Sequence, residues 1–138
     1  MKELKINHLA VVIIVVIGQL IPMGWYGLLA KPWMAYNELT MEYIQANQST
    51  TPYIVSIIQS FITAYALAWI FTKMRIESAI SGLIAAVVMG FAFNLLPSMT
   101  QNLFSFRPYE LTWIDGGVNL IIFAIAGVIL GAWRKYKE

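Results

Sequence analysis

Uncharged apolar windows alternate with short polar segments along the whole chain. The windows run from about 6 to 29, 53 to 72, 78 to 99 and 111 to 133. Each is about 20 residues or longer, the length that an α-helix needs to cross roughly 30 Å of hydrocarbon. The pattern predicts an all-α fold, a bundle of four transmembrane helices that forms one domain over residues 1–138.

The longest segment that does not span is the one from about Ala30 to Pro52. Asn37 or Thr40 is suited to cap a short helix here, with Glu42 near the positive end of that helix. We expect a short amphipathic helix, or an ordered loop, on the outer surface between the first two spans.

Three spans carry small residues at a spacing of four. This spacing lets helix backbones approach closely in lipid, where the burial of apolar surface no longer drives association. The first span differs, because residues 11–17 are wholly apolar and mostly β-branched, and we expect it to face lipid most. The small residues are Ser56, Ser60, Ala64 and Ala68, then Gly82, Ala86 and Gly90, then Gly127 and Gly131.

Composition and charge agree with a membrane protein. Of the 138 residues, 59% are hydrophobic and 12% are charged, against roughly a quarter charged in soluble domains. The net charge of +2 is too small to suggest a nucleic-acid partner. The basic residues are concentrated on one side of the four spans, so the positive-inside rule places both termini in the cytoplasm. That side has Lys2, Lys5, Lys73, Arg75, Arg134, Lys135 and Lys137, and the other has Lys31 and Arg107.

The tryptophans fit the same layout, because their amphipathic rings prefer the two membrane boundaries. The stretch from 23 to 36, MGWYGLLAKPWMAY, also holds Tyr26 and lies where the first span leaves the hydrocarbon. We interpret it as a boundary elbow, with an aromatic binding site as the alternative. Trp25, Trp33 and Trp113 fall near the outer boundary, and Trp69 and Trp133 fall near the inner one. We expect a multi-pass protein of a bacterial inner membrane.

Five polar residues fall within the outer halves of the spans. Polar side chains in hydrocarbon are costly and usually face the bundle interior or a wet cavity, so we predict one shared polar cluster. Two prolines, Pro22 and Pro97, lie late in outward-running spans and predict a kink or a helix end. The five polar residues are Gln19, Gln59, Asn94, Asp115 and Asn119, and Ser60 and Thr63 are candidates to join them.

Two roles stay open for this cluster, hydrogen bonding between helices or a site for a ligand, ion or proton. A site at Asp115 requires burial beside Asn119 and a polar partner such as Gln19, Asn94 or Arg107. Alternatively, Asp115 lies at headgroup depth and stabilises the start of its helix. Arg107, in an outer turn, either pins the loop to the helix or binds an anion.

The residues that most enzymes need are scarce. The chain has no Cys, and its single histidine, His8, lies at the inner boundary, where it is a boundary residue or, alternatively, a haem or metal ligand. No nucleophile lies beside a base, and no metal or cofactor motif is present. We therefore expect no enzyme activity, no cofactor and no metal site.

The order of short motifs resembles the DUF1761 family of small bacterial membrane proteins. The resemblance covers nearly the whole chain and implies a compact four-span protein without an established reaction. Family members often carry a His or another polar residue in the second and third spans, where this chain has Gln59 and Asn94, so histidine chemistry is not implied. The motifs are Trp25-Tyr26, Lys31-x-Trp33, Phe106-Arg107, Trp113-Ile-Asp115-Gly-Gly and Gly127-x-x-x-Gly131-Ala-Trp133.

These features predict a scaffold or accessory subunit that acts through helix packing. Its partners would be the lipid bilayer and either a second copy or another membrane protein. The alternative is a small transporter or channel for a polar solute, an ion or a proton that uses the polar cluster. Because four spans enclose little space, such a path would need an oligomer.

Overall fold

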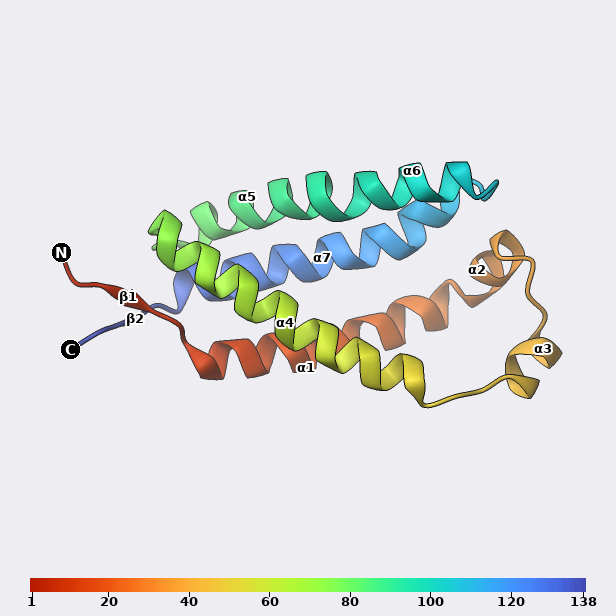
Figure 1. Cartoon of the computed structure of the whole chain (residues 1–138), viewed down its shortest axis with the longest axis horizontal. Helices are drawn as coiled ribbons and strands as arrows, with labels where there is room; N and C mark the ends of the chain where they lie inside the picture. The colour runs from red at the N-terminus through yellow and green to blue at the C-terminus, as the bar shows by residue number, and fades with distance from the viewer.

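Four long helical spans run along a common axis (Figure 1). The computed structural model describes all 138 residues. Each span is long and apolar enough to cross a membrane, so the predicted four-helix membrane fold is confirmed. The spans are α1 (His8–Leu28), α4 (Thr51–Met74), a third span built from α5 (Ala79–Gly90), the π-helical η1 (Phe91–Leu95) and α6 (Leu96–Phe104), and α7 (Glu110–Ala132).

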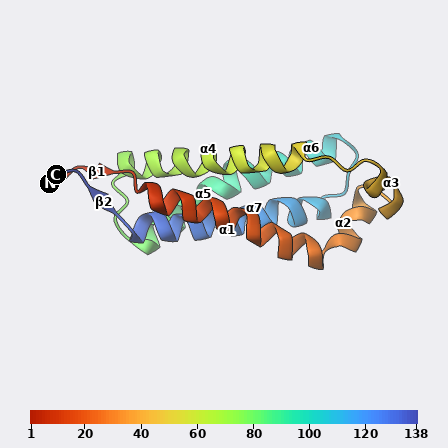
Figure 2. The same cartoon turned by 90° about the horizontal axis from the view of Figure 1, so that it is seen from below.

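The two ends of the bundle differ in structure, as Figures 1 and 2 both show. At one end lie both termini, where β1 (Leu4–Lys5) pairs antiparallel with β2 (Lys135–Tyr136), a ribbon that the apolar pattern does not predict. At the other end, α2 (Ala30–Tyr36) and α3 (Met41–Ala46) connect α1 to α4. Following the orientation that the charges predict, we call the terminal end inner and the opposite end outer.

The segment between α1 and α4 contains two short helices. Thr40, one of the two expected caps, begins α3, and its hydroxyl oxygen accepts a hydrogen bond from the Tyr43 N–H at 3.2 Å. Most residues of α3 are exposed, as expected of a short surface helix.

Helices α5 and α7 pack against each other through glycine. A Cβ atom at Gly82 would overlap the carbonyl oxygen of Gly127, and one at Gly131 would overlap the carbonyl oxygen of Ser78. Further outward, Gly90 lies against the ring of Phe123. The backbones of α5 and α7 therefore meet where the sequence spacing predicts close packing.

Helix α1 belongs to the core, so the expectation that it faces lipid most is wrong. Its residues Val11, Ile14 and Val15 are buried in one apolar cluster with residues of α4 and α7. The small side chains of Ala64 and Ala68 on α4 leave room for these branched residues, which explains the burial. In contrast, none of the residues 51–62 in the outer half of α4 is buried.

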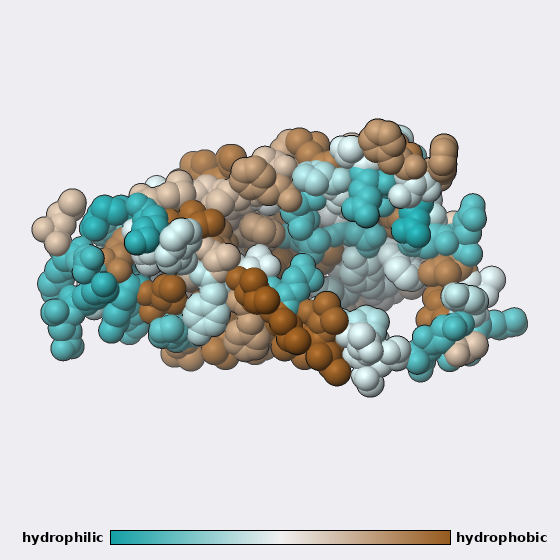
Figure 3. Space-filling view, in the orientation of Figure 1, coloured by the Kyte–Doolittle hydropathy of each residue, from teal (hydrophilic) through white to brown (hydrophobic).

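Hydrophobic and hydrophilic residues are unevenly distributed on the face of the molecule shown in Figure 3. On the face shown in Figure 3, hydrophilic residues gather at the two ends, and hydrophobic residues cover much of the middle. This distribution suits a multi-pass membrane protein, because the bilayer then contacts the apolar middle of the helices.

Polar contacts join the chain segments at the inner end. Arg75 pairs with Glu77 at 3.0 Å, and the Tyr136 hydroxyl donates to the other oxygen of the same carboxylate at 2.9 Å. This hydrogen bond to Glu77 raises the pKa of Tyr136 above its ordinary value. Nearby, the His8 ring lies within hydrogen-bond distance of the Tyr65 hydroxyl, with 2.9 Å between Nδ1 and the oxygen. His8 is the first residue of α1, and its position at the membrane boundary stays a prediction.

Candidate functional site

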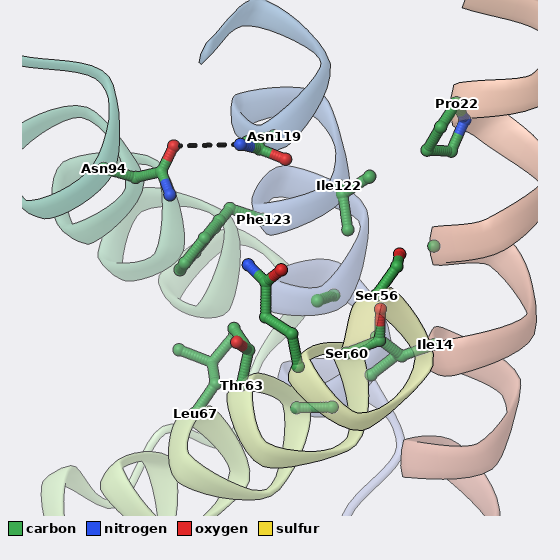
Figure 4. Close-up of a pocket in the computed structure, with 14 residues that line it drawn as sticks. Ile14, Pro22, Ser56, Ser60, Thr63, Leu67, Asn94, Asn119, Ile122 and Phe123 are labelled. Carbon is green, nitrogen blue, oxygen red and sulfur yellow. Dashed lines mark hydrogen bonds between the residues drawn. The ribbon is translucent and has the colours of Figure 1, made fainter. Parts of the chain in front are cut away.

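A cavity of about 140 Å³ extends from the middle of the bundle into its outer half (Figure 4). It brings together Gln59, Asn94 and Asn119, three residues of the predicted cluster that come from three different spans. Thr63 also lines it, as expected. The other lining residues are Ile14, Gly18, Pro22, Ser56, Ser60, Ala64, Leu67, Ile122, Phe123 and Ala126.

The polar groups of the cavity are only partly paired with each other. The Asn119 amide nitrogen donates to the Asn94 amide oxygen at 3.2 Å (Figure 4). Whichever way the two amides are turned, one NH₂ group and one carbonyl oxygen of the pair keep hydrogen-bonding capacity. The side chains of Gln59 and Thr63 form no hydrogen bond within the chain. The cavity therefore offers neutral donors and acceptors to a further molecule.

Two proline residues shape the backbone around this cavity. In η1 the Leu96 N–H donates to the Phe91 carbonyl five residues back, which widens the helical turn that carries Asn94. Pro97 follows directly and has no N–H to continue the regular α-helical pattern. In α1, Pro22 leaves the carbonyl of Gly18, which also lines the cavity, without its usual donor. Single π-helical turns like η1 are frequent at functional sites.

Gln19 links two helices beside the cavity. Its amide nitrogen donates to the Ser60 hydroxyl at 2.9 Å, and its amide oxygen accepts from the Ser56 hydroxyl at 3.3 Å. Both polar atoms of the Gln19 amide, the nitrogen and the oxygen, thereby hold α1 to α4. This residue does not line the cavity, and its geometry fits the helix-linking role.

Asp115 lies away from the cavity and binds the aromatic elbow. One carboxylate oxygen accepts hydrogen bonds from the Tyr26 hydroxyl at 2.6 Å and from the Trp33 indole N–H at 3.2 Å. The Trp25 indole N–H donates to the neighbouring carbonyl of Ile114 at 2.8 Å. Three aromatic side chains thus dock α1 and α2 onto the first turns of α7. Asp115 forms no hydrogen bond or ion pair with any of the partners expected from the sequence.

Arg107 does not join either group. It lies exposed in the turn between α6 and α7, directly after Phe106, whose φ of 61° makes the turn tight. Its backbone N–H donates to the Asn102 carbonyl at 2.8 Å, while its side chain pairs with neither Glu110 nor Asp115. The turn is therefore held by this backbone bond and by the Asn102 amide, which donates to the Thr112 hydroxyl at 2.9 Å, and not by the salt bridge that the sequence suggests.

The tryptophans divide into two groups. Trp25 and Trp33 are half-buried and hydrogen-bonded to α7, whereas Trp69, Trp113 and Trp133 are more exposed. The exposed three can lie at the membrane boundaries, and Lys73 lies over the Trp69 ring, 5.8 Å from its centre. Anchoring at the boundary stays a prediction for all five, and Trp25 and Trp33 have an additional role in binding α7.

With this geometry established, comparison with known protein families gives one result. Residues 9–131 match the family model described as "Protein of unknown function (DUF1761)". The chain belongs to the DUF1761 family. Neither the curated proteins nor the solved structures contain a match to it.

Three of the five motifs that indicated DUF1761 in the sequence meet in three dimensions. Trp25, Tyr26 and Trp33 come from the first motifs, and Asp115 comes from the fourth span. Their contact was not predicted, although all four residues fall at the same level in the predicted orientation. The sequence did hold a signal for this contact, because several aromatic side chains that can donate hydrogen bonds lie at the same depth as a single carboxylate, Asp115.

Proposed function

We propose that this DUF1761 protein is a membrane-embedded binding protein, which holds a small uncharged polar group in its cavity. The observation that carries the proposal is the convergence of Gln59, Asn94 and Asn119 on one cavity with hydrogen-bonding capacity to spare. Gln59 lies eight residues after the start of α4, or about 12 Å along the helix axis. At that depth, unpaired amide groups cost free energy that a bound polar molecule would recover.

The chemistry of the lining favours a neutral ligand over an ion or a proton. The cavity presents amides and hydroxyls, whereas Asp115, the carboxylate expected to serve an ion or proton, does not line it and binds Tyr26 and Trp33 through one oxygen. A charged ligand in this setting would lose its hydration without gaining an opposite charge, which is costly in a membrane interior.

Binding can be measured by saturation-transfer NMR on the protein in phosphatidylcholine nanodiscs. Glycerol and 1-decanoylglycerol serve as neutral probes, and decyl phosphate serves as the charged probe. We expect a neutral probe to bind and the charged probe not to bind. Asn94→Leu should weaken neutral binding at least 10-fold, and Thr63→Val, which keeps the side-chain shape, should weaken it several-fold.

The matched control is Gln101→Leu, which replaces an exposed amide outside the cavity. It should leave binding unchanged. The proposal is wrong if neither neutral probe binds, or if Gln101→Leu and Asn94→Leu weaken binding equally. Transport of a bound solute, and the oligomer that it would require, stay predictions that a flux assay in liposomes tests.

A scaffold or accessory role is a second proposal, supported by the outer half of α4. Ile54, Ile58 and Ile62 follow one another at a spacing of four and are 56%, 53% and 64% exposed. Such a row offers a continuous apolar surface to another helix. We expect Ile58→Cys to form disulfide cross-links with a second copy in native membranes, and Ile84→Cys on α5, equally exposed at 59%, to form none. Equal cross-linking at both positions would indicate random collision.

A further inference from the structure

We propose that the cavity receives the uncharged head of a membrane amphiphile, one that bears hydroxyl and carbonyl groups as a monoacylglycerol does, and that this head enters sideways from the lipid. The inference rests on the proposed binding function and names its ligand class. It also assigns a route of entry, which the binding function alone does not.

The mouth of the cavity lies on the side of the bundle. Helix α4 packs on α1 and α7 but has no extended interface with α5, η1 or α6. Gln59 lines the cavity and is nevertheless exposed, so the cavity is open beside it. On η1, Phe93 precedes the lining residue Asn94 in the chain and is 78% exposed. Because Gln59 and η1 both lie well inside their spans, this opening faces lipid and not the aqueous phase.

The size of the cavity suits a small head group. A volume of about 140 Å³ is about ten times the roughly 10–15 Å³ that a cavity needs to hold one water molecule. It therefore accommodates on the order of ten non-hydrogen atoms. A glycerol ester head has about this size and carries two hydroxyl donors and a carbonyl acceptor, which match the free amide groups of Gln59 and of the Asn94–Asn119 pair.

The arrangement of polar and apolar groups along the cavity suits entry from the outer leaflet. Its polar side on α4 runs from Ser56 to Thr63, about 10 Å along the axis, and begins about 7.5 Å below the start of the helix. An uncharged head can descend this distance because the hydroxyls and amides replace its hydration. Deeper in the cavity, Leu67 gives an apolar floor that limits the descent.

The experiment compares the two neutral probes and locates the bound head. In nanodiscs, 1-decanoylglycerol should bind with an apparent Kd at least 100-fold lower than that of glycerol, because its acyl chain concentrates the head in the bilayer at the mouth. A monoacylglycerol with a photoreactive diazirine beside its ester should label residues 56–67 of α4 and residues 91–95 of η1. Excess 1-decanoylglycerol should prevent the labelling, and Gln59→Leu should reduce it whereas Gln101→Leu should not.

Three outcomes would overturn the inference, and only one of them also overturns the binding function. If glycerol binds as tightly as 1-decanoylglycerol and requires Asn94, the cavity binds a solute from water, and only the lipid route is wrong. If the diazirine label spreads evenly over exposed positions such as Ile84, the probe reports surrounding lipid. If neither probe shows binding that depends on Asn94 or Thr63, both proposals fail together.

Discussion

Close packing of α5 on α7 makes a quantitative prediction for Gly127. A Cβ atom at this position would lie 2.5 Å from the Cβ of Ala86, about 0.9 Å short of the 3.4 Å at which ordinary contact begins. It would also overlap the carbonyl oxygen of Gly82. Because both obstacles belong to a helix backbone or lie next to it, the two helices must separate. We therefore expect Gly127→Ala to destabilise the protein by about 1–3 kcal/mol, the usual cost of overpacking.

The magnitude follows from the contacts that separation would weaken. A gap of 0.5–1 Å removes about a quarter to a half of the dispersion energy of each atom pair along the interface. The assay is unfolding in mixed micelles with increasing dodecyl sulfate, followed by circular dichroism. Gly24→Ala is the matched control, because a Cβ there meets nothing within 4 Å. It should be neutral or stabilise by up to about 1 kcal/mol, since alanine is the better helix former. If Gly127→Ala is as stable as Gly24→Ala, the interface is not close-packed as described.

Three further predictions follow from other contacts. Tyr26→Phe removes one of the two donors to Asp115 and should cost about 1–3 kcal/mol in the same unfolding assay; an unchanged stability would mean that the elbow does not hold α7. Pro97→Ala restores a backbone donor, so the π-helical turn should relax toward α-helix and binding of 1-decanoylglycerol should weaken as Asn94 turns; unchanged binding would contradict this. Tyr136 binds its proton more tightly in the folded chain because its pKa is raised, so its contact stabilises at neutral pH and is lost as the pH rises above about 10. Tyr136→Phe should flatten the dependence of stability on pH in that alkaline range only.

Periodic features of the sequence predict the structure well, because each of them answers to a single physical requirement. Hydrocarbon thickness determines the length of an apolar helix, so the four spans follow from the apolar windows. Glycine spacing predicts the α5–α7 contact for a similar reason, since only small residues permit it. The partners of a polar residue have no such periodic signal. Gln19, Gln59 and Asp115 all fall in the outer halves of their spans, yet the rotation of each helix directs them to an interhelical bond, a cavity and an aromatic elbow.

The same difference explains why the first span was misplaced and the cavity was found only in part. A wholly apolar segment suits lipid and a protein core equally, so the burial of α1 depends on the alanines that α4 presents to it. Pairings of this kind between distant segments decide how each helix is rotated about its axis. The π-helical turn η1 before Pro97 further changes which way the following side chains of the third span face. The depth of a residue can therefore be predicted from the sequence of its own helix, whereas predicting which residues it contacts requires the packing of all four spans.

The two halves of the bundle are built differently, and this difference bears on binding. The α5–α7 hairpin is held by backbone contact at glycine, which leaves its spacing little freedom. The outer half of α4 buries no residue, and its side-chain hydrogen bonds to the bundle are those of Gln19. Polar residues from the α5–α7 hairpin and from α4 line the cavity, so one wall is held by close backbone contacts and the other by two hydrogen bonds and by packing on α1 and α7. A ligand that bonds to Gln59 and to the Asn94–Asn119 pair would join the two walls. Binding would then also stabilise the outer half of α4, the segment that carries the row of exposed isoleucines available to a partner.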